Sequence, residues 1–154
     1  MQIEIISFGK SKEQNIFQAE EEYLKRLKKE YSITLTQLPQ GKNSSSPAAT
    51  MLEEAKNLIN HLKEDSKLII LDEYGPQMTS KEFANFLQKH KNNATQHLVF
   101  AVGGPYGWDD SIRNKANFSL SLSKLTFPAH IAKFLLIEQL YRASSILNGH
   151  PYHK

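Results

Sequence analysis

Hydrophobic residues are spaced along this chain in two alternating ways. Short apolar or every-second-residue runs, which are typical of strands, cover residues 2–7, 32–38, 68–71, 97–102 and 118–123. The segments between and after them predict helices, over 16–31, from Pro47 to Leu62, after Thr79, from Asp109 and from Ile131 to Leu147. This order predicts an α/β fold, with a mainly parallel sheet and helices on both faces. Because no repeat or linker divides the chain, we expect residues 1–154 to form a single domain.

Residues that start helices support these boundaries. Ser46 followed by Pro47 is typical of a helix start, with the serine as N-cap. Thr79 and Glu82 have the spacing of a capping box. The polar stretch 41–46 before the second helix is expected to be a loop.

The loops that follow three of the strands indicate where a ligand binds. In sheets of parallel strands, ligands bind outside the carboxyl ends of the strands. This rule selects the loops after Leu71, Val102 and Ser123, each of which contains turn residues. We therefore expect these loops to form the walls of one pocket.

Composition excludes several classes of protein. Hydrophobic residues make up 40% and charged residues 23% of the 154 positions, as in a soluble globular protein. No apolar run approaches the roughly 18 residues that suggest a membrane span, and the first residues do not resemble a signal peptide. The absence of cysteine excludes disulfides, a thiolate nucleophile and a Cys-ligated zinc site. Together these features favour a cytoplasmic protein without a membrane partner.

The net charge of +3 is small for a protein that binds nucleic acid by charge alone. The basic residues are nevertheless concentrated in the first third, at Lys10, Lys12, Lys25, Arg26, Lys28, Lys29 and Lys42. They are either solvated residues of helix faces and loops or a surface that contacts phosphates.

The segment from Gly103 to Gly107 has glycines spaced neither as in a dinucleotide-binding loop nor as in a P-loop. It is either a tight turn or a place where a flat ligand lies against the backbone. His150 and His153 have no cysteine or strong acidic partner nearby, so a metal site is not expected. No Gly-x-Ser-x-Gly sequence is present to indicate a serine hydrolase.

The last predicted helix is apolar on nearly every side, which suggests a subunit interface. Within it, Glu138 and Arg142 are four residues apart and share one face. They form either an ordinary surface pair or a functional pair whose arginine grips a phosphate or carbonyl. After Gly149 the chain continues with two imidazoles, a phenol and a proline, an unusual set for a terminal segment.

Several segments together resemble the bacterial large-subunit rRNA methyltransferase H family, within the SPOUT superfamily. The resemblance covers the full length and is densest after Leu98. It rests on Leu71-Asp72, Val102-Gly103-Gly104, Leu120–Pro128, Glu138–Ala143 and His150–Lys154.

This resemblance implies a SPOUT fold with a C-terminal trefoil knot, a homodimer, and S-adenosylmethionine as methyl donor without a metal. It implies N3 of a pseudouridine in 23S rRNA as acceptor, and we expect assembled ribosomes to be the substrate. The residues that would contact the donor are Leu71, Gly103, Gly104, Leu122, Ser123, Lys124, Leu125, Thr126 and Phe127.

The residues expected to act on the acceptor are Glu138, Arg142, Tyr152 and His153. A pseudouridine N3 must lose its proton before it can accept a methyl group. An imidazole, which titrates near about pH 6.5, suits a base, so we assign this role to His153 rather than Glu138. Tyr152 would stack on or hydrogen-bond the ring, and Arg142 would neutralise negative charge.

The chain departs from the family pattern after Pro128, where Ala129 precedes His130 and Lys133 stands in place of a common arginine. Two other functions remain open. The same scaffold would serve to methylate another RNA nucleotide, for example at a ribose hydroxyl. Alternatively, the chain would be a non-catalytic ribosome-binding factor, for which both the tail and the loop 122–127 would be unnecessary.

Overall fold

A five-stranded parallel sheet forms the centre of the protein. The computed structural model describes residues 1–10, 14–42 and 46–154. The strands are β1 (Gln2–Phe8), β2 (Ser32–Leu38), β3 (Lys67–Leu71), β4 (His97–Val102) and β5 (Phe118–Leu120). They lie in the order β2-β1-β4-β3-β5, and every neighbouring pair is parallel. The predicted α/β architecture is confirmed.

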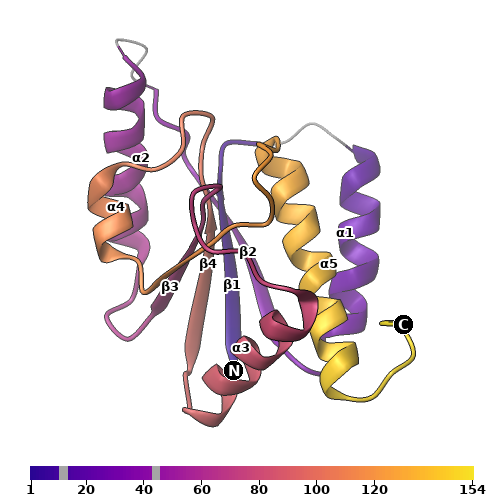
Figure 1. Cartoon of the computed structure of the whole chain (residues 1–154). Coiled ribbons are helices and arrows are strands. Elements are labelled where there is room, and N and C mark those ends of the chain that lie inside the picture. The colour runs from indigo at the N-terminus through magenta and orange to yellow at the C-terminus, as the bar shows by residue number, and fades with distance from the viewer. Residues whose placement is uncertain (11–13, 43–45) are drawn as a thin grey trace.

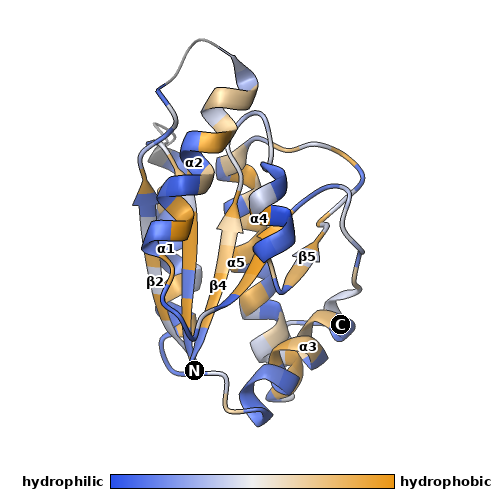
Figure 2. Ribbon diagram, turned by 90° about the vertical axis from the view of Figure 1, so that its left-hand side faces the viewer, coloured by the Kyte–Doolittle hydropathy of each residue, from blue (hydrophilic) through white to orange (hydrophobic). Residues whose placement is uncertain are grey.

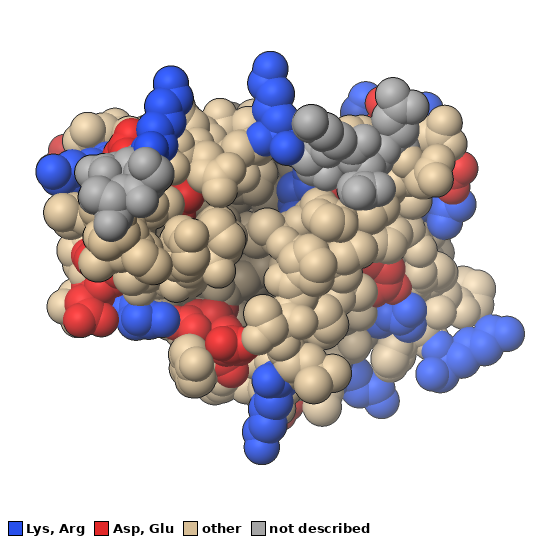
Figure 3. Space-filling model, turned by 90° about the horizontal axis from the view of Figure 1, so that it is seen from above, with Lys and Arg blue, Asp and Glu red and all other residues tan. Residues whose placement is uncertain are grey.

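Helices cover both faces of this sheet, as predicted (Figure 1). On one face lie α1 (Gln14–Leu27), α3 (Ser80–Asn92) and α5 (Ala129–Leu147). On the other lie α2 (Pro47–His61) and α4 (Asp110–Lys115). Figure 2 shows that the strands are mostly hydrophobic, whereas α2 and α4, which face the viewer, carry many hydrophilic residues. The carboxyl ends of all five strands point to the same end of the molecule, which Figure 3 views from above.

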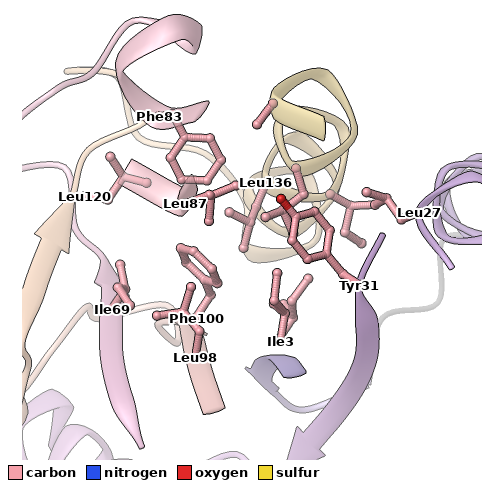
Figure 4. Packing of buried hydrophobic residues seen from close by; sticks show 14 of the residues in the cluster. Ile3, Leu27, Tyr31, Ile69, Phe83, Leu87, Leu98, Phe100, Leu120 and Leu136 are labelled. Atoms are coloured by element: carbon pink, nitrogen blue, oxygen red, sulfur yellow. The ribbon is translucent and has the colours of Figure 1, made fainter. Parts of the chain in front are cut away.

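Two hydrophobic cores result, one on each side of the sheet. Beneath α1, α3 and α5, Phe100 of β4 packs among side chains of the helices and neighbouring strands (Figure 4). Leu136 of α5 is fully buried in this core. Beneath α2 and α4, Val99 and Trp108 belong to the second core. Each fully buried large side chain contributes about 1.5–3 kcal/mol to folding.

The helix starts predicted from the sequence are confirmed. The Ser46 hydroxyl accepts a hydrogen bond from the Ala49 N–H at 3.1 Å, with Pro47 as the first helical residue. At the start of α3, the Thr79 N–H donates to the Glu82 carboxylate at 2.7 Å, and the Glu82 N–H donates back to the threonine hydroxyl. Of the loop predicted over 41–46, residues 43–45 lie outside the described part of the chain.

Two predicted elements are too long. The first helix ends at Leu27 instead of Tyr31, although Tyr31 is still buried in the core. The strand predicted over 118–123 ends at Leu120. Beyond it, the Ser121 hydroxyl donates to the Ser123 carbonyl at 2.9 Å, and the Ser123 hydroxyl accepts from a backbone N–H at 3.0 Å. Because these local bonds compete with sheet pairing, the chain leaves the sheet here.

A buried carboxylate lies near the amino ends of the strands, on the α2 side. Glu4 accepts hydrogen bonds from Thr36 at 2.5 Å and from His61 at 2.8 Å, and His97 lies 3.5 Å away. Burial by itself raises the pKa of the Glu4 carboxyl. The hydrogen bonds and the attraction of the two imidazoles outweigh burial and hold the pKa below its usual 4.5.

Stability should therefore fall in acid in a way that depends on Glu4. A carboxyl whose pKa is lower in the folded state stabilises above its unfolded pKa, and this contribution disappears as pH falls through the folded value. We expect the free energy of unfolding to decrease between about pH 5 and pH 3, and Glu4→Gln to flatten this part of the profile. Urea unfolding of both proteins at several pH values measures the effect. Parallel profiles would contradict this role of Glu4.

Candidate active site

A hollow of about 740 Å³ opens at the carboxyl ends of the strands. Its walls are the loops after β3, β4 and β5 and the start of α5, so the three-loop pocket predicted from the sequence is confirmed. Figure 3 looks onto this end of the molecule. A volume in this range suits a small molecule or cofactor. Eight of the nine residues assigned above to the donor line it: Leu71, Gly103, Gly104, Leu122, Ser123, Leu125, Thr126 and Phe127.

Lys124, the ninth, is not part of this lining. Its side chain is exposed and borders a second hollow, together with Glu73, Tyr74, Gly75 and Gln77. The reason is local, because neighbouring residues of a tight loop point in different directions.

Trp108 forms one wall of the pocket and explains the glycine beside it. Its indole N–H donates to the Leu71 carbonyl at 2.8 Å, and the residue is only 4% exposed. A Cβ on Gly103 would lie 3.2 Å from the indole Cε2. A Cβ on Gly104 would overlap the carboxylate of buried Glu54, whose pKa is raised by burial. Both glycines therefore allow buried side chains to approach the backbone of the loop.

An ion pair holds the loop after β3 against the rest of the site. Arg113 of α4 donates to the Asp72 carboxylate at 2.9 Å and to the Trp108 carbonyl at 2.8 Å. The Thr126 hydroxyl donates to Glu73 at 2.5 Å and so joins the loops after β3 and β5. Sequence reasoning did not identify Trp108, Arg113 or Glu73 as parts of the site, since no short-range spacing relates them.

The four residues assigned to the acceptor lie together. One oxygen of Glu138 accepts from Arg142 at 2.7 and 3.1 Å, as the shared helix face predicts. The same oxygen accepts from the Tyr152 hydroxyl at 3.0 Å. Arg142 lies over the Tyr152 ring, 4.8 Å from its centroid, and contacts His153 Nδ1 at 3.4 Å. This arrangement fixes the terminal residues relative to α5.

Tyr23 of α1 is a fifth member that the sequence did not reveal. Its hydroxyl lies 3.0 Å from that of Tyr152, although 129 positions separate them in the chain. Burial and the hydrogen bonds to Tyr23 and Glu138 raise the pKa of the Tyr152 phenol. Tyr152 therefore stays neutral near pH 7, and this arrangement suits it for hydrogen bonding and stacking rather than for proton abstraction.

Within one chain, this cluster does not reach the pocket. Glu138 and Arg142 lie six and ten residues after Ala132, which lines the pocket, so about 9 Å and about 15 Å of helix α5 separate them from it. Figure 1 accordingly shows the C-terminus beside α1 and away from the carboxyl ends of the strands. The residues assigned to the donor and those assigned to the acceptor therefore form two separate groups in a single chain.

The two positions that depart from the family pattern lie in the first turns of α5. His130 is half-buried and is not part of the pocket lining. Lys133 is buried and pairs with buried Glu20 of α1 at 3.1 Å. The other Glu20 oxygen has no hydrogen-bond partner among the described residues. The guanidinium group of an arginine could donate to both carboxylate oxygens of Glu20, whereas Lys133 contacts only one of them.

Two further findings apply to residues 1–10, 14–42 and 46–154. No group of three or more His, Asp or Glu side chains there is arranged to hold a metal ion. No helix in this part of the chain is long and apolar enough to cross a membrane.

Comparison with known proteins matches this chain over nearly its whole length. The family described as "Predicted SPOUT methyltransferase" matches residues 1–153. A protein of Geotalea daltonii is 38% identical over 153 residues, and one of Bacteroides thetaiotaomicron 33% over 155, each with 99% of both chains covered. A Francisella philomiragia protein is 38% identical over 156 residues, with both chains fully covered. All three are named "Ribosomal RNA large subunit methyltransferase H". The resemblance noted from the sequence is confirmed: this chain belongs to the SPOUT methyltransferase family, together with the ribosomal RNA large subunit methyltransferases H.

Proposed function

We propose that this protein methylates 23S rRNA in assembled ribosomes, at N3 of a pseudouridine, with S-adenosylmethionine as donor. The observation that carries the proposal is the hollow formed by the loops after β3, β4 and β5. Eight residues that the family resemblance assigns to the donor meet there, although they come from three separate parts of the chain. The names of the full-length relatives support ribosomal RNA as the substrate. Action on ribosomes implies a cytoplasmic location.

The pocket fits a flat, partly polar donor. Gly103 and Gly104 present backbone without side chains, and Ser123 and Thr126 add hydroxyls to a lining that also contains the charged residues Asp72, Glu73 and Arg113. When bound, S-adenosylmethionine supplies a methyl group on a positively charged sulfonium. The role of the pocket residues is to hold this methyl group in line with the acceptor nitrogen.

The cluster around Arg142 supplies what the acceptor needs. For the methyl group to bond to N3, its bond to the sulfonium sulfur would break, and the N3 proton would pass to a base, which we assign to His153. Arg142, whose pKa is raised by its hydrogen bonds to Glu138, remains charged and stabilises negative charge on the ring. Tyr152 stacks on or hydrogen-bonds the ring. Glu138 orients both the arginine and the tyrosine through one oxygen.

We further propose a homodimer in which one subunit supplies the donor pocket and its partner supplies the acceptor cluster. The separation of about 15 Å between Arg142 and Ala132 within one chain supports this proposal. Helix α5 also offers Ile131, Phe134 and Leu135, none of which is fully buried in the single chain. Covering these apolar side chains would stabilise a dimer.

The trefoil knot and the single domain belong to the same proposal. The Ser121 N–H donates to the Pro76 carbonyl at 2.9 Å, and Thr126 bonds Glu73. The segment that leads into α5 is thus packed against the loop after β3. This contact supports a trefoil knot in which that segment passes through the loop. Because helices from both halves of the chain pack on one sheet, we take residues 1–154 as one domain.

Transfer of a labelled methyl group tests the function. Large ribosomal subunits, whole ribosomes and free 23S rRNA are incubated with the protein and labelled S-adenosylmethionine, and the modified nucleotide is identified by mass spectrometry. We expect N3-methylpseudouridine in assembled ribosomes and little product in free rRNA. Ribosomes with uridine in place of pseudouridine are the control.

Other outcomes identify the alternatives. A methyl group on a ribose hydroxyl would identify another RNA nucleotide as acceptor. Binding to ribosomes without any methyl transfer would indicate a non-catalytic binding factor. Equal labelling of free and assembled rRNA would show that ribosome assembly is not recognised.

A further inference from the structure

Exposed apolar side chains gather around the mouth of the donor pocket. Tyr74, Leu125 and Tyr106 are 82%, 71% and 54% exposed, and each comes from a different one of the three pocket loops. The other exposed large hydrophobic residues of the described chain, Leu35 and Leu52, lie on β2 and α2. Single exposed apolar residues are common, but a group around a pocket indicates a surface that binds a partner.

The second hollow lies directly beside the donor pocket and shares Glu73 and Tyr74 with it. Its volume is about 580 Å³, and Gly75, Gln77 and Lys124 complete its lining. An aromatic ring, an ammonium group and an amide therefore border one open space.

The loop that carries Tyr74 is held in place. The Tyr74 N–H donates to the Asp72 carboxylate at 3.2 Å, and the Gly75 N–H donates to the Asp72 carbonyl at 2.9 Å. A Cβ on Gly75 would lie 3.1 Å from Ser119, so glycine allows the loop to pack on β5. The exposed ring is thus presented by an ordered backbone, which reduces the entropy lost when a ligand binds.

These groups match an unpaired nucleotide. Single-stranded RNA is bound by stacking of bases on aromatic rings and by cations at the phosphates, and amide side chains hydrogen-bond base edges. Glu73 is the one acidic residue of the lining, and its carboxylate is turned toward the Thr126 hydroxyl. Lys10 and Lys42 are also exposed and follow β1 and β2, so they lie at the same end of the molecule.

We propose that the hollow between Tyr74 and Lys124 binds an RNA nucleotide adjacent to the methylated one, with its base on the Tyr74 ring and its phosphate at Lys124. This inference rests on the proposed function. It also gives Lys124 a role other than donor binding. An RNA fits this surface better than a second subunit does, because the hollow is small and contains a cation, whereas α5 has the larger apolar face.

Direct binding of large ribosomal subunits to the protein tests the site. Stacking on an aromatic side chain contributes about 1–3 kcal/mol per base, so Tyr74→Ala should weaken binding about 5- to 150-fold. Tyr74→Phe keeps the ring and should restore most of this loss. Lys124→Gln should weaken binding and reduce its dependence on salt concentration by about one counterion. Leu52→Ala, which removes an exposed apolar side chain that lines neither hollow, is the matched control.

Three results would overturn the inference. Unchanged binding by Tyr74→Ala would show that the ring does not contact RNA. Weaker dimerisation of Tyr74→Ala without RNA would assign the ring to the subunit interface. A loss of S-adenosylmethionine affinity alone, measured by calorimetry, would assign it to the donor site. This assay measures binding of ribosomal subunits and does not require methylation. If the wild-type protein bound the subunits but transferred no methyl group, the proposed function would be refuted, and the comparison of Tyr74→Ala with the wild type would still test the nucleotide site.

Discussion

Deletion of residues 150–154 is expected to abolish methyl transfer while S-adenosylmethionine still binds. The deletion removes Tyr152 and His153, which contact Glu138 and Arg142 but do not line the donor pocket. Loss of the proposed general base and of the proposed contact with the ring should lower kcat by about 1000-fold or more. Single-turnover methylation of ribosomes measures the rate, and calorimetry measures donor affinity.

The same deletion also tests whether the site is shared between subunits. A heterodimer of one Gly103→Val subunit and one tail-deleted subunit should contain about one working site. One of its two sites combines the intact pocket of one subunit with the intact tail of the other, whereas both defects fall in the remaining site. Full-length protein and each parent homodimer are the controls. If verified heterodimers are inactive while both parents are folded and dimeric, the tail acts within its own subunit.

Gly103→Val is expected to remove donor binding while the protein remains folded. The new Cβ would lie 3.2 Å from the Trp108 indole, so the valine must displace the ring that forms the pocket wall or extend into the donor space. Donor affinity should fall by about 100-fold or more, equivalent to about 2.7 kcal/mol. Calorimetric titration with S-adenosylmethionine measures this change directly.

Stability controls separate this effect from misfolding. Crowding against Trp108 should reduce the free energy of unfolding by about 1–3 kcal/mol. Ile3→Val, at a buried position in the opposite core, should also cost about 1 kcal/mol but leave donor affinity unchanged. Normal donor binding by folded Gly103→Val would place the donor elsewhere. No donor binding by the wild-type protein would refute the methyltransferase proposal.

The sequence alone determined the order of strands and helices and the position of the pocket. Apolar spacing depends on the period of each element, so β1, β4 and α5 could be identified without knowledge of their neighbours. Helix starts at Ser46 and Thr79 depend on hydrogen bonds across three residues, which local sequence contains. Parallel strands place their carboxyl ends together, so three loops could be assigned to one pocket.

The family resemblance added the candidate residues, but it could not show how each side chain is directed. Only the structure showed that Lys124 borders a different hollow from its neighbours in the loop 122–127. Only the structure showed that β5 stops at Leu120. In the sequence, the alternation of apolar residues with serines continues for three more positions, but there the serine hydroxyls bond to the local backbone instead. Loops have no fixed period, so sequence spacing does not determine the direction of their side chains.

The tertiary structure also decided which distant residues meet. Arg113 pairs with Asp72, and Tyr23 contacts Tyr152, although no local pattern connects either pair. It also placed Arg142 about 15 Å along α5 from Ala132 of the pocket, which motivates the shared site. A sequence pattern indicates which side of each helix or strand is buried. The contacts between distant residues depend instead on how the helices pack across the sheet. That packing is fixed by the whole core, because close-packed side chains from many segments must fit together at once.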